Sequence, residues 1–132
     1  MATGRRGTRV LLLDVHEEVR DLLRDRLAAH ADFEVISATG DPDEAVALST
    51  TLQPHLLLVD VRRLENGPAY CQSLRQAAPR SLLVILSSFL HAWERPLYES
   101  LGVSAFLAKD GGFAALLAAL QRLAASRLDD TR

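Results

Sequence analysis

The chain has 132 residues, of which 48% are hydrophobic and 24% charged, and its formal net charge is −2. This length suits one domain around a single core, and the composition is that of a folded globular protein, which excludes an intrinsically disordered chain. The charge leaves no excess of basic residues for nucleic acid or for an anionic membrane. We therefore expect no direct nucleic acid binding by this chain.

The cysteine and hydropathy patterns bear on the cellular compartment. Cys71 is the only cysteine and cannot form an intramolecular disulfide, and its helix-like surroundings indicate a packing residue rather than a nucleophile. No apolar run approaches the roughly 18 residues that span a bilayer. The basic start of the chain also lacks the apolar stretch of a secretory signal. We therefore expect a cytoplasmic protein with no membrane-spanning segment.

Two pairs of strand and helix open the chain. The apolar run at 9–14 predicts a strand buried on both faces, and residues 16–30 carry apolar side chains at helical spacing. Residues 33–38 are rich in strand formers. Asp41 then predicts an N-cap, with Pro42 at the first position of the second helix. This is the most clearly marked helix start in the sequence.

Three more units of the same kind follow. Residues 55–60, 81–88 and 104–108 predict strands, because each is a short apolar run bounded by turn-forming or polar residues. Helical patterns over 67–79 and 112–126 follow the first and the last of these strands. A shorter helix is expected after the middle strand.

The short helix covers 94–102. Pro96 would cost about 3 kcal/mol in a helix interior, so we expect the helix to start at Glu94 or at the next residue, with Pro96 in its first turn. The loop before it then contains Phe89, Leu90 and Trp93. Trp93 is either exposed, which would indicate a partner or ligand site, or tucked against the sheet as part of the core.

The final helix is apolar on most of its faces. Alanines fill much of it between five larger apolar residues, which are Phe113, Leu116, Leu117, Leu120 and Leu123. Such a helix is too apolar for a solvated surface, so we expect a partner or a second copy of the chain to cover it. A homodimer through this helix would be made by the residues flanking its sheet-facing stripe, chiefly Leu117 and Ala118.

Five repeats of strand and helix predict an α/β fold, a doubly wound five-stranded parallel sheet with helices on both faces. We place the domain at 9–126 and expect flexible ends at 1–8 and 127–132. In such sheets ligands bind outside the carboxyl ends of the strands. The residues that end the apolar runs are Asp14, Asp60, Ser87 and Lys109.

Two acids, a hydroxyl and a lysine suit the transfer of a phosphoryl group to a carboxylate, which acts as nucleophile while the other groups offset charge. The four histidines show no ligand spacing, and we expect no metal role for His16, His30, His55 or His91. The motifs "LLLDVHEEVR", "PHLLLVD", "VILSS" and "GVSAFLAKD" resemble the response-regulator receiver domain of two-component signalling. The last motif is most similar to receivers that precede a helix-turn-helix DNA-binding domain.

The resemblance implies roles for particular residues and a strand order of 2-1-3-4-5. Asp60 takes the place of the phosphoacceptor, Lys109 that of the invariant lysine, Ser87 that of the switch hydroxyl and Phe106 that of the switch aromatic. A Mg²⁺ ion would be held by Asp14 and Asp60, and a histidine kinase or another signalling protein would be the partner. Any enzymatic activity would be limited to self-phosphorylation at Asp60.

The sequence departs from the family pattern at the acidic pocket. Val15 stands where the second acid of an adjacent pair is expected, so Mg²⁺ binding should be weak or absent. The loop after Asp60 is short, and it brings Arg62 to a position whose backbone carbonyl normally helps to bind the metal. The Arg62 guanidinium either pairs with Asp60 or Asp14 and replaces the ion, or it points to solvent. Lys109 is expected to pair with Asp60 in the resting protein.

These departures favour an atypical receiver that works as a signalling and protein-interaction module, with impaired Mg²⁺-dependent phosphorylation. One alternative is a functional phosphorylation switch that accepts a phosphoryl group on Asp60 from a histidine kinase. Another is a ligand-sensing pseudo-receiver, in which a small molecule binds near the former acidic pocket.

Overall fold

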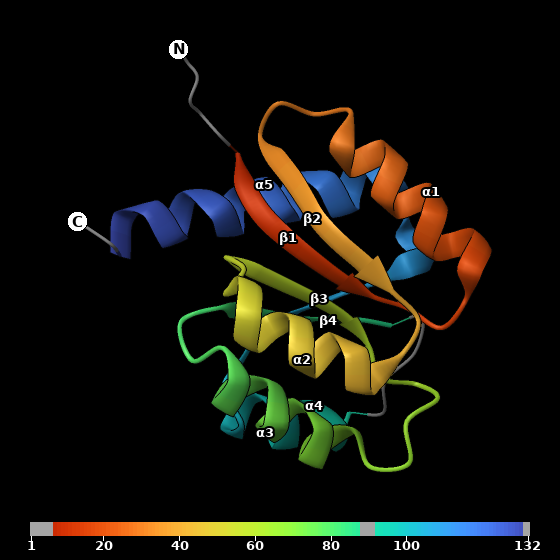
Figure 1. Cartoon of the computed structure of the whole chain (residues 1–132), viewed down its shortest axis with the longest axis vertical. Helices are drawn as coiled ribbons and strands as arrows, with labels where there is room; N and C mark the ends of the chain where they lie inside the picture. Colours follow the sequence, from red (N-terminus) through yellow and green to blue (C-terminus); the bar gives the residue numbers. More distant parts are fainter. Residues whose placement is uncertain (1–6, 88–91, 131–132) are drawn as a thin grey trace.

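The computed structural model describes residues 7–87 and 92–130, with side chains as far as Arg127. A five-stranded parallel sheet forms its centre, in the order β2-β1-β3-β4-β5 (Figure 1). The strands are β1 (Thr8–Leu13), β2 (Phe33–Thr39), β3 (Leu56–Asp60), β4 (Leu82–Leu86) and β5 (Val103–Leu107). This confirms the predicted fold and strand order.

Helices cover both faces of the sheet. They are α1 (Glu17–Ala28), α2 (Pro42–Leu52), α3 (Gly67–Ala77), α4 (Glu94–Ser100) and α5 (Phe113–Asp130), with a short 3₁₀ turn, η1 (Lys109–Gly111), before α5. α1 and α5 pack on one face, and α2, α3 and α4 pack on the other (Figure 1). Within the described residues, no helix combines the length and the apolar character needed to cross a membrane.

The apolar runs form the central strands because both of their faces are covered. In β3, Leu57 packs with the α2 and α3 side, whereas Leu56 and Leu58 pack with α1 and α5. Successive side chains of a strand point to opposite faces, so each layer of helices receives alternate residues. A strand buried on both faces therefore reads as the continuous apolar run seen in the sequence.

Two helices begin where their sequence signals predict. The Asp41 carboxylate accepts a hydrogen bond from the Asp43 N–H at 3.0 Å and caps α2, with Pro42 in the first turn. α4 begins at Glu94, so that Pro96 lies in its first turn as expected. Trp93, just before α4, is 69% exposed. The predicted loop positions Phe89 and Leu90 lie outside the described residues.

α5 is longer than the sequence pattern predicts, because it runs to Asp130 rather than ending near residue 126. No proline or glycine follows Gly112 to stop it. Leu116 and Leu120 are buried in the core shared with α1, and Leu117 packs partly against the same core. Most leucine side chains of α5 thus pack against the sheet.

Candidate functional site

The strand register brings four polar residues to the carboxyl edge of the sheet. The last residue of β1 pairs with Val59, so Asp14 and Asp60 follow on neighbouring strands. Asp60 pairs with the last residue of β4, and Ser87 comes next in the chain. Lys109 follows β5 within η1. The four residues that the sequence analysis named as candidate site residues therefore lie at one edge of the sheet.

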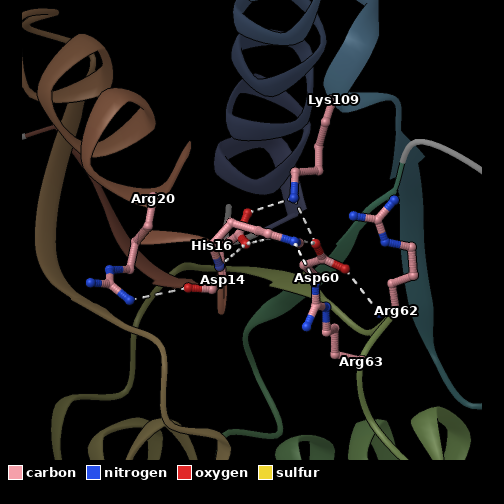
Figure 2. Close-up of polar contacts among 7 residues, drawn as sticks. All are labelled: Asp14, His16, Arg20, Asp60, Arg62, Arg63 and Lys109. Atoms are coloured by element: carbon pink, nitrogen blue, oxygen red, sulfur yellow. Dashed lines mark hydrogen bonds and ion pairs between the residues drawn. The ribbon is translucent and has the colours of Figure 1, made fainter. Parts of the chain in front are cut away.

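Lys109 joins the two acids. Its ammonium nitrogen lies 2.6 Å from Asp60 Oδ2, with hydrogen-bond geometry, and 2.7 Å from Asp14 Oδ2 (Figure 2). Asp14 and Asp60 are buried, and the Lys109 side chain is 9% exposed. This confirms the predicted ion pair between Lys109 and Asp60. The same ammonium also forms an ion pair with Asp14.

His16 is a site residue that the sequence analysis missed. It lies at the N-cap of α1 in an extended conformation, and its N–H donates to Asp14 Oδ1 at 2.9 Å. Its Nδ1 is 3.2 Å from Asp14 Oδ1 and 3.9 Å from Asp60 Oδ2. The available signal was its position two residues after a strand-end acid, because a side chain that starts the following helix can turn back over the sheet edge.

Three donor groups therefore gather at this edge. Asp14, His16 and Asp60 each offer one possible metal-ligating atom, and these atoms all lie within 4.8 Å of one another. Val15 supplies no ligand; it is 46% exposed and lines a hollow beside Asp60 with Arg63. The position at which a second acid is expected therefore contributes no carboxylate to the site.

Arg62 contacts Asp60 through its backbone. Its backbone N–H donates to Asp60 Oδ1 at 2.9 Å, so the Asp60 carboxylate folds back over its own loop. The guanidinium is exposed and, among the described residues, forms no ion pair with Asp14 or Asp60. Of the two predicted alternatives, the structure supports the solvent-facing one, because Lys109 already occupies the space between the carboxylates.

Ser87 follows the end of β4, and Phe106 lies in β5. The Ser87 N–H donates to the Leu107 carbonyl at 3.0 Å, and its side chain lines a pocket with Arg62 and Glu94. Phe106 is half-buried, and the Arg95 guanidinium lies 4.7 Å from the centre of its ring. Both residues thus adjoin the α4 surface.

Two other predicted site residues differ in their exposure. Trp93 is exposed at the start of α4, and Leu117 packs partly against the core beneath α5. Cys71 lies in the core, as expected, and burial raises the pKa of its thiol to about 12. A thiol with that pKa stays protonated at neutral pH and is a poor nucleophile.

A pocket of about 430 Å³ opens beside the acids, between α1 and α5. His16, Arg62 and Lys109 line its polar end, whereas Leu23 and Leu116 line its apolar end. The pocket thus adjoins the acidic cluster, near which the sequence analysis placed the small-molecule site of a pseudo-receiver.

Residues 10–121 match the response regulator receiver domain family. The chain is a response regulator receiver domain. The receiver is 30% identical over 105 residues to the DNA-binding transcriptional activator DevR/DosR of Mycobacterium tuberculosis, covering 77% of this chain and 48% of that protein. It is 28% identical over 104 residues to the response regulator protein VraR of Staphylococcus aureus, covering 76% of this chain and 49% of that protein. The receiver thus spans about half the length of these relatives.

Solved structures agree on the fold. The CheY-like receiver domain protein of Methanospirillum hungatei superposes with a TM-score of 0.83 at 14% identity, covering 95% of this chain and 99% of that one. The response regulator domain of Thermotoga maritima CheB gives 0.79 at 20% identity, covering 94% and 98%. Receiver domains typically bind Mg²⁺ at an acidic pocket, and in this receiver that pocket is the cluster around Asp14 and Asp60.

Proposed function

We propose that this receiver is an atypical signalling and protein-interaction module of two-component signal transduction, with impaired Mg²⁺-dependent phosphorylation at Asp60. The observation that carries the proposal is the position of Lys109. Its ammonium lies within 2.7 Å of an oxygen of both site carboxylates. The negative charge that would attract a divalent ion is therefore already partly neutralised.

The donor set supports the same conclusion. Mg²⁺ requires near-octahedral coordination by oxygen and loses its water reluctantly. Asp14 and Asp60 supply carboxylate oxygens, but Val15 supplies none and His16 adds a nitrogen. One fewer anionic oxygen and a competing ammonium make this pocket a poor fit for Mg²⁺. The phosphoacceptor position is retained, while the ion that offsets the charge of the transferred group is poorly held.

The partners follow from the family. We propose that a histidine kinase or another signalling protein contacts this receiver, and that it works in the cytoplasm. The related DevR/DosR is a DNA-binding transcriptional activator, and this receiver covers less than half of it. We propose that direct contact with DNA lies outside this domain, because the domain has a net charge of −2 and no excess of basic residues.

The proposal is tested by intact-mass analysis after incubation with a small phosphodonor, such as acetyl phosphate, and Mg²⁺. We expect little or no species carrying the added mass of one phosphoryl group. Asp60→Asn is the control for adducts at other residues. A stoichiometric adduct that disappears in Asp60→Asn would contradict the proposal and would establish a functional phosphorylation switch.

A second variant locates the cause of the impairment. Val15→Asp restores a carboxylate at the exposed position beside Asp60, so we expect Mg²⁺ affinity to rise at least about tenfold in a calorimetric titration. Val15→Asn is the matched control, because it has the same size as aspartate but no charge. If Val15→Asp binds Mg²⁺ no better than Val15→Asn, the missing acid is not the cause of weak Mg²⁺ binding. The altered loop after Asp60 would then be its cause.

A further inference from the structure

We propose that the pocket between α1 and α5 binds an amphipathic organic anion, a small molecule with an apolar body and one anionic group such as a carboxylate. The inference goes beyond the proposed function, because it concerns a ligand of this pocket and requires no phosphoryl transfer to Asp60. It rests on the size of the pocket, on the apolar side chains that line it and on two arginines without an acidic partner.

The pocket has the size of a small-molecule site. Its volume of about 430 Å³ lies within the range of roughly 300–1,000 Å³ that is usual for ligand pockets. Neither Asp14 nor Asp60 is among its described lining residues, so the pocket is distinct from the acidic cluster. Lys109 borders both the pocket and the acids. A ligand that fills the pocket therefore does not have to displace this lysine from the acids.

Apolar side chains of both helices line the pocket. Leu22 and Leu23 come from α1, and Phe113 and Leu116 come from α5. Leu22 is 53% exposed, although the other three are buried or half-buried. A hydrocarbon or aromatic group placed against these side chains leaves water, and so does the exposed surface of Leu22. The lining therefore favours a ligand with an apolar body.

The charged residues of the pocket favour an anion. Arg26 and Arg62 both line it, and within the described residues neither guanidinium forms an ion pair with an acid. Asp110 is the one acid among the described lining residues, and Lys109 is already paired with the buried acids. A guanidinium stays charged at neutral pH and donates paired hydrogen bonds to a carboxylate or phosphate group. Two arginines against one acid thus leave an excess of positive charge in the pocket.

Arg26 brings the two features together. Its guanidinium lies 5.5 Å from the centre of the Phe113 ring, so a positive charge lies directly beside the apolar lining. A small inorganic anion would leave that lining in water, and a neutral apolar molecule would leave both arginines unpaired. The pocket is thus complementary to a molecule that has both an apolar body and a negative charge.

The test is an NMR titration of the full chain at neutral pH with three probes. Phenylbutyrate carries both an aromatic body and a carboxylate, phenylbutyramide has the same body without the charge, and acetate has the charge without the body. We expect phenylbutyrate to shift the backbone N–H signals of Leu22 and Phe113, and to bind at least about tenfold more tightly than either of the other probes. The signal of Cys71 in α3, on the other face of the sheet, should stay in place.

Variants identify the residues that cause the preference for an anion. The double variant Arg26→Gln with Arg62→Gln should weaken phenylbutyrate binding at least about tenfold and leave phenylbutyramide binding unchanged. Arg24→Gln is the matched control, because it removes an arginine of α1 that pairs with Asp21 and is not among the described lining residues. All three arginines are exposed, so their replacement leaves the core intact.

The proposal is overturned if phenylbutyrate binds no more tightly than phenylbutyramide or acetate, or if it fails to shift the Leu22 and Phe113 signals. It is also overturned if the double variant binds phenylbutyrate as well as the wild type does. Phosphoryl adduct formation is measured with Mg²⁺ and without any of these probes, so this proposal and the proposed function fail independently.

Discussion

At the scale of single residues, Lys109 determines the electrostatics of the site. Its ammonium contacts both Asp14 and Asp60, and all three side chains are buried or nearly so. Two carboxylates this close repel each other in a region of low dielectric constant, and burial also costs each of them its hydration. The lysine therefore supplies the counter-charge that the two buried acids share.

Removing this cation should destabilise the receiver. We expect Lys109→Met to lower the free energy of unfolding by about 3 kcal/mol in urea denaturation at pH 7, because two buried carboxylates lose their counter-charge. Arg62→Met is the matched control. Its exposed guanidinium has no ion pair with either acid, so the loss should stay within about 0.5 kcal/mol. Equal losses in the two variants would show that Arg62 shares the role of Lys109.

At the scale of elements, the start of α2 illustrates local control of structure. The Asp41 carboxylate accepts hydrogen bonds from two backbone N–H groups of the first turn. The Asp41 N–H donates to Thr39 Oγ1 at 3.1 Å, and that hydroxyl donates to the Glu44 carboxylate. The end of β2 and the start of α2 are thus joined through short polar side chains.

Asp41→Ala should therefore destabilise the receiver by about 1 kcal/mol, the usual cost of losing an N-cap. Thermal or urea unfolding followed by circular dichroism measures the change. Asp43→Ala is the control, because it removes an exposed acid of the same turn that caps no N–H group. If Asp43→Ala costs as much as Asp41→Ala, the effect is one of charge at the helix end and not of capping.

At the scale of the whole molecule, α5 packs in the core with one face, and another face is the predicted contact with a second copy of the chain. Leu116 and Leu120 are buried on the sheet, so a second copy would meet the flanking residues, chiefly the half-buried Leu117 and Ala118. A homodimer through this flank remains a prediction. The leucines that prompted it are largely accounted for by the core.

The dimer is tested by sedimentation at tens of micromolar. We expect a dimer that Leu117→Glu dissociates, because the contact would bury an unpaired carboxylate. Leu22→Glu, at a leucine that is 53% exposed on α1, is the matched control and should leave the dimer intact. A monomeric profile of the wild-type chain at every concentration would contradict the prediction.

The sequence by itself determined the architecture and the edge at which the site lies. Alternating apolar runs and helical patterns require right-handed crossovers, and these lead to a parallel sheet covered on both faces. Because the carboxyl ends of parallel strands share one edge, the residues ending β1, β3 and β4 could be assigned to one site without coordinates. The same logic placed Asp14, Asp60 and Lys109 together.

Tertiary structure decided how the side chains at that edge are used. His16 turns into the acids, the Arg62 guanidinium is exposed and forms no ion pair with either acid, and Trp93 is exposed, although the sequence pattern left the arginine and tryptophan open and assigned the histidine no role. All three residues lie outside regular strands, where hydrophobic periodicity carries no information. Their orientation depends on the backbone angles of the loops and on which side chain occupies the space between the two carboxylates. Lys109 occupies that space, and it can do so only because β5 packs beside β4.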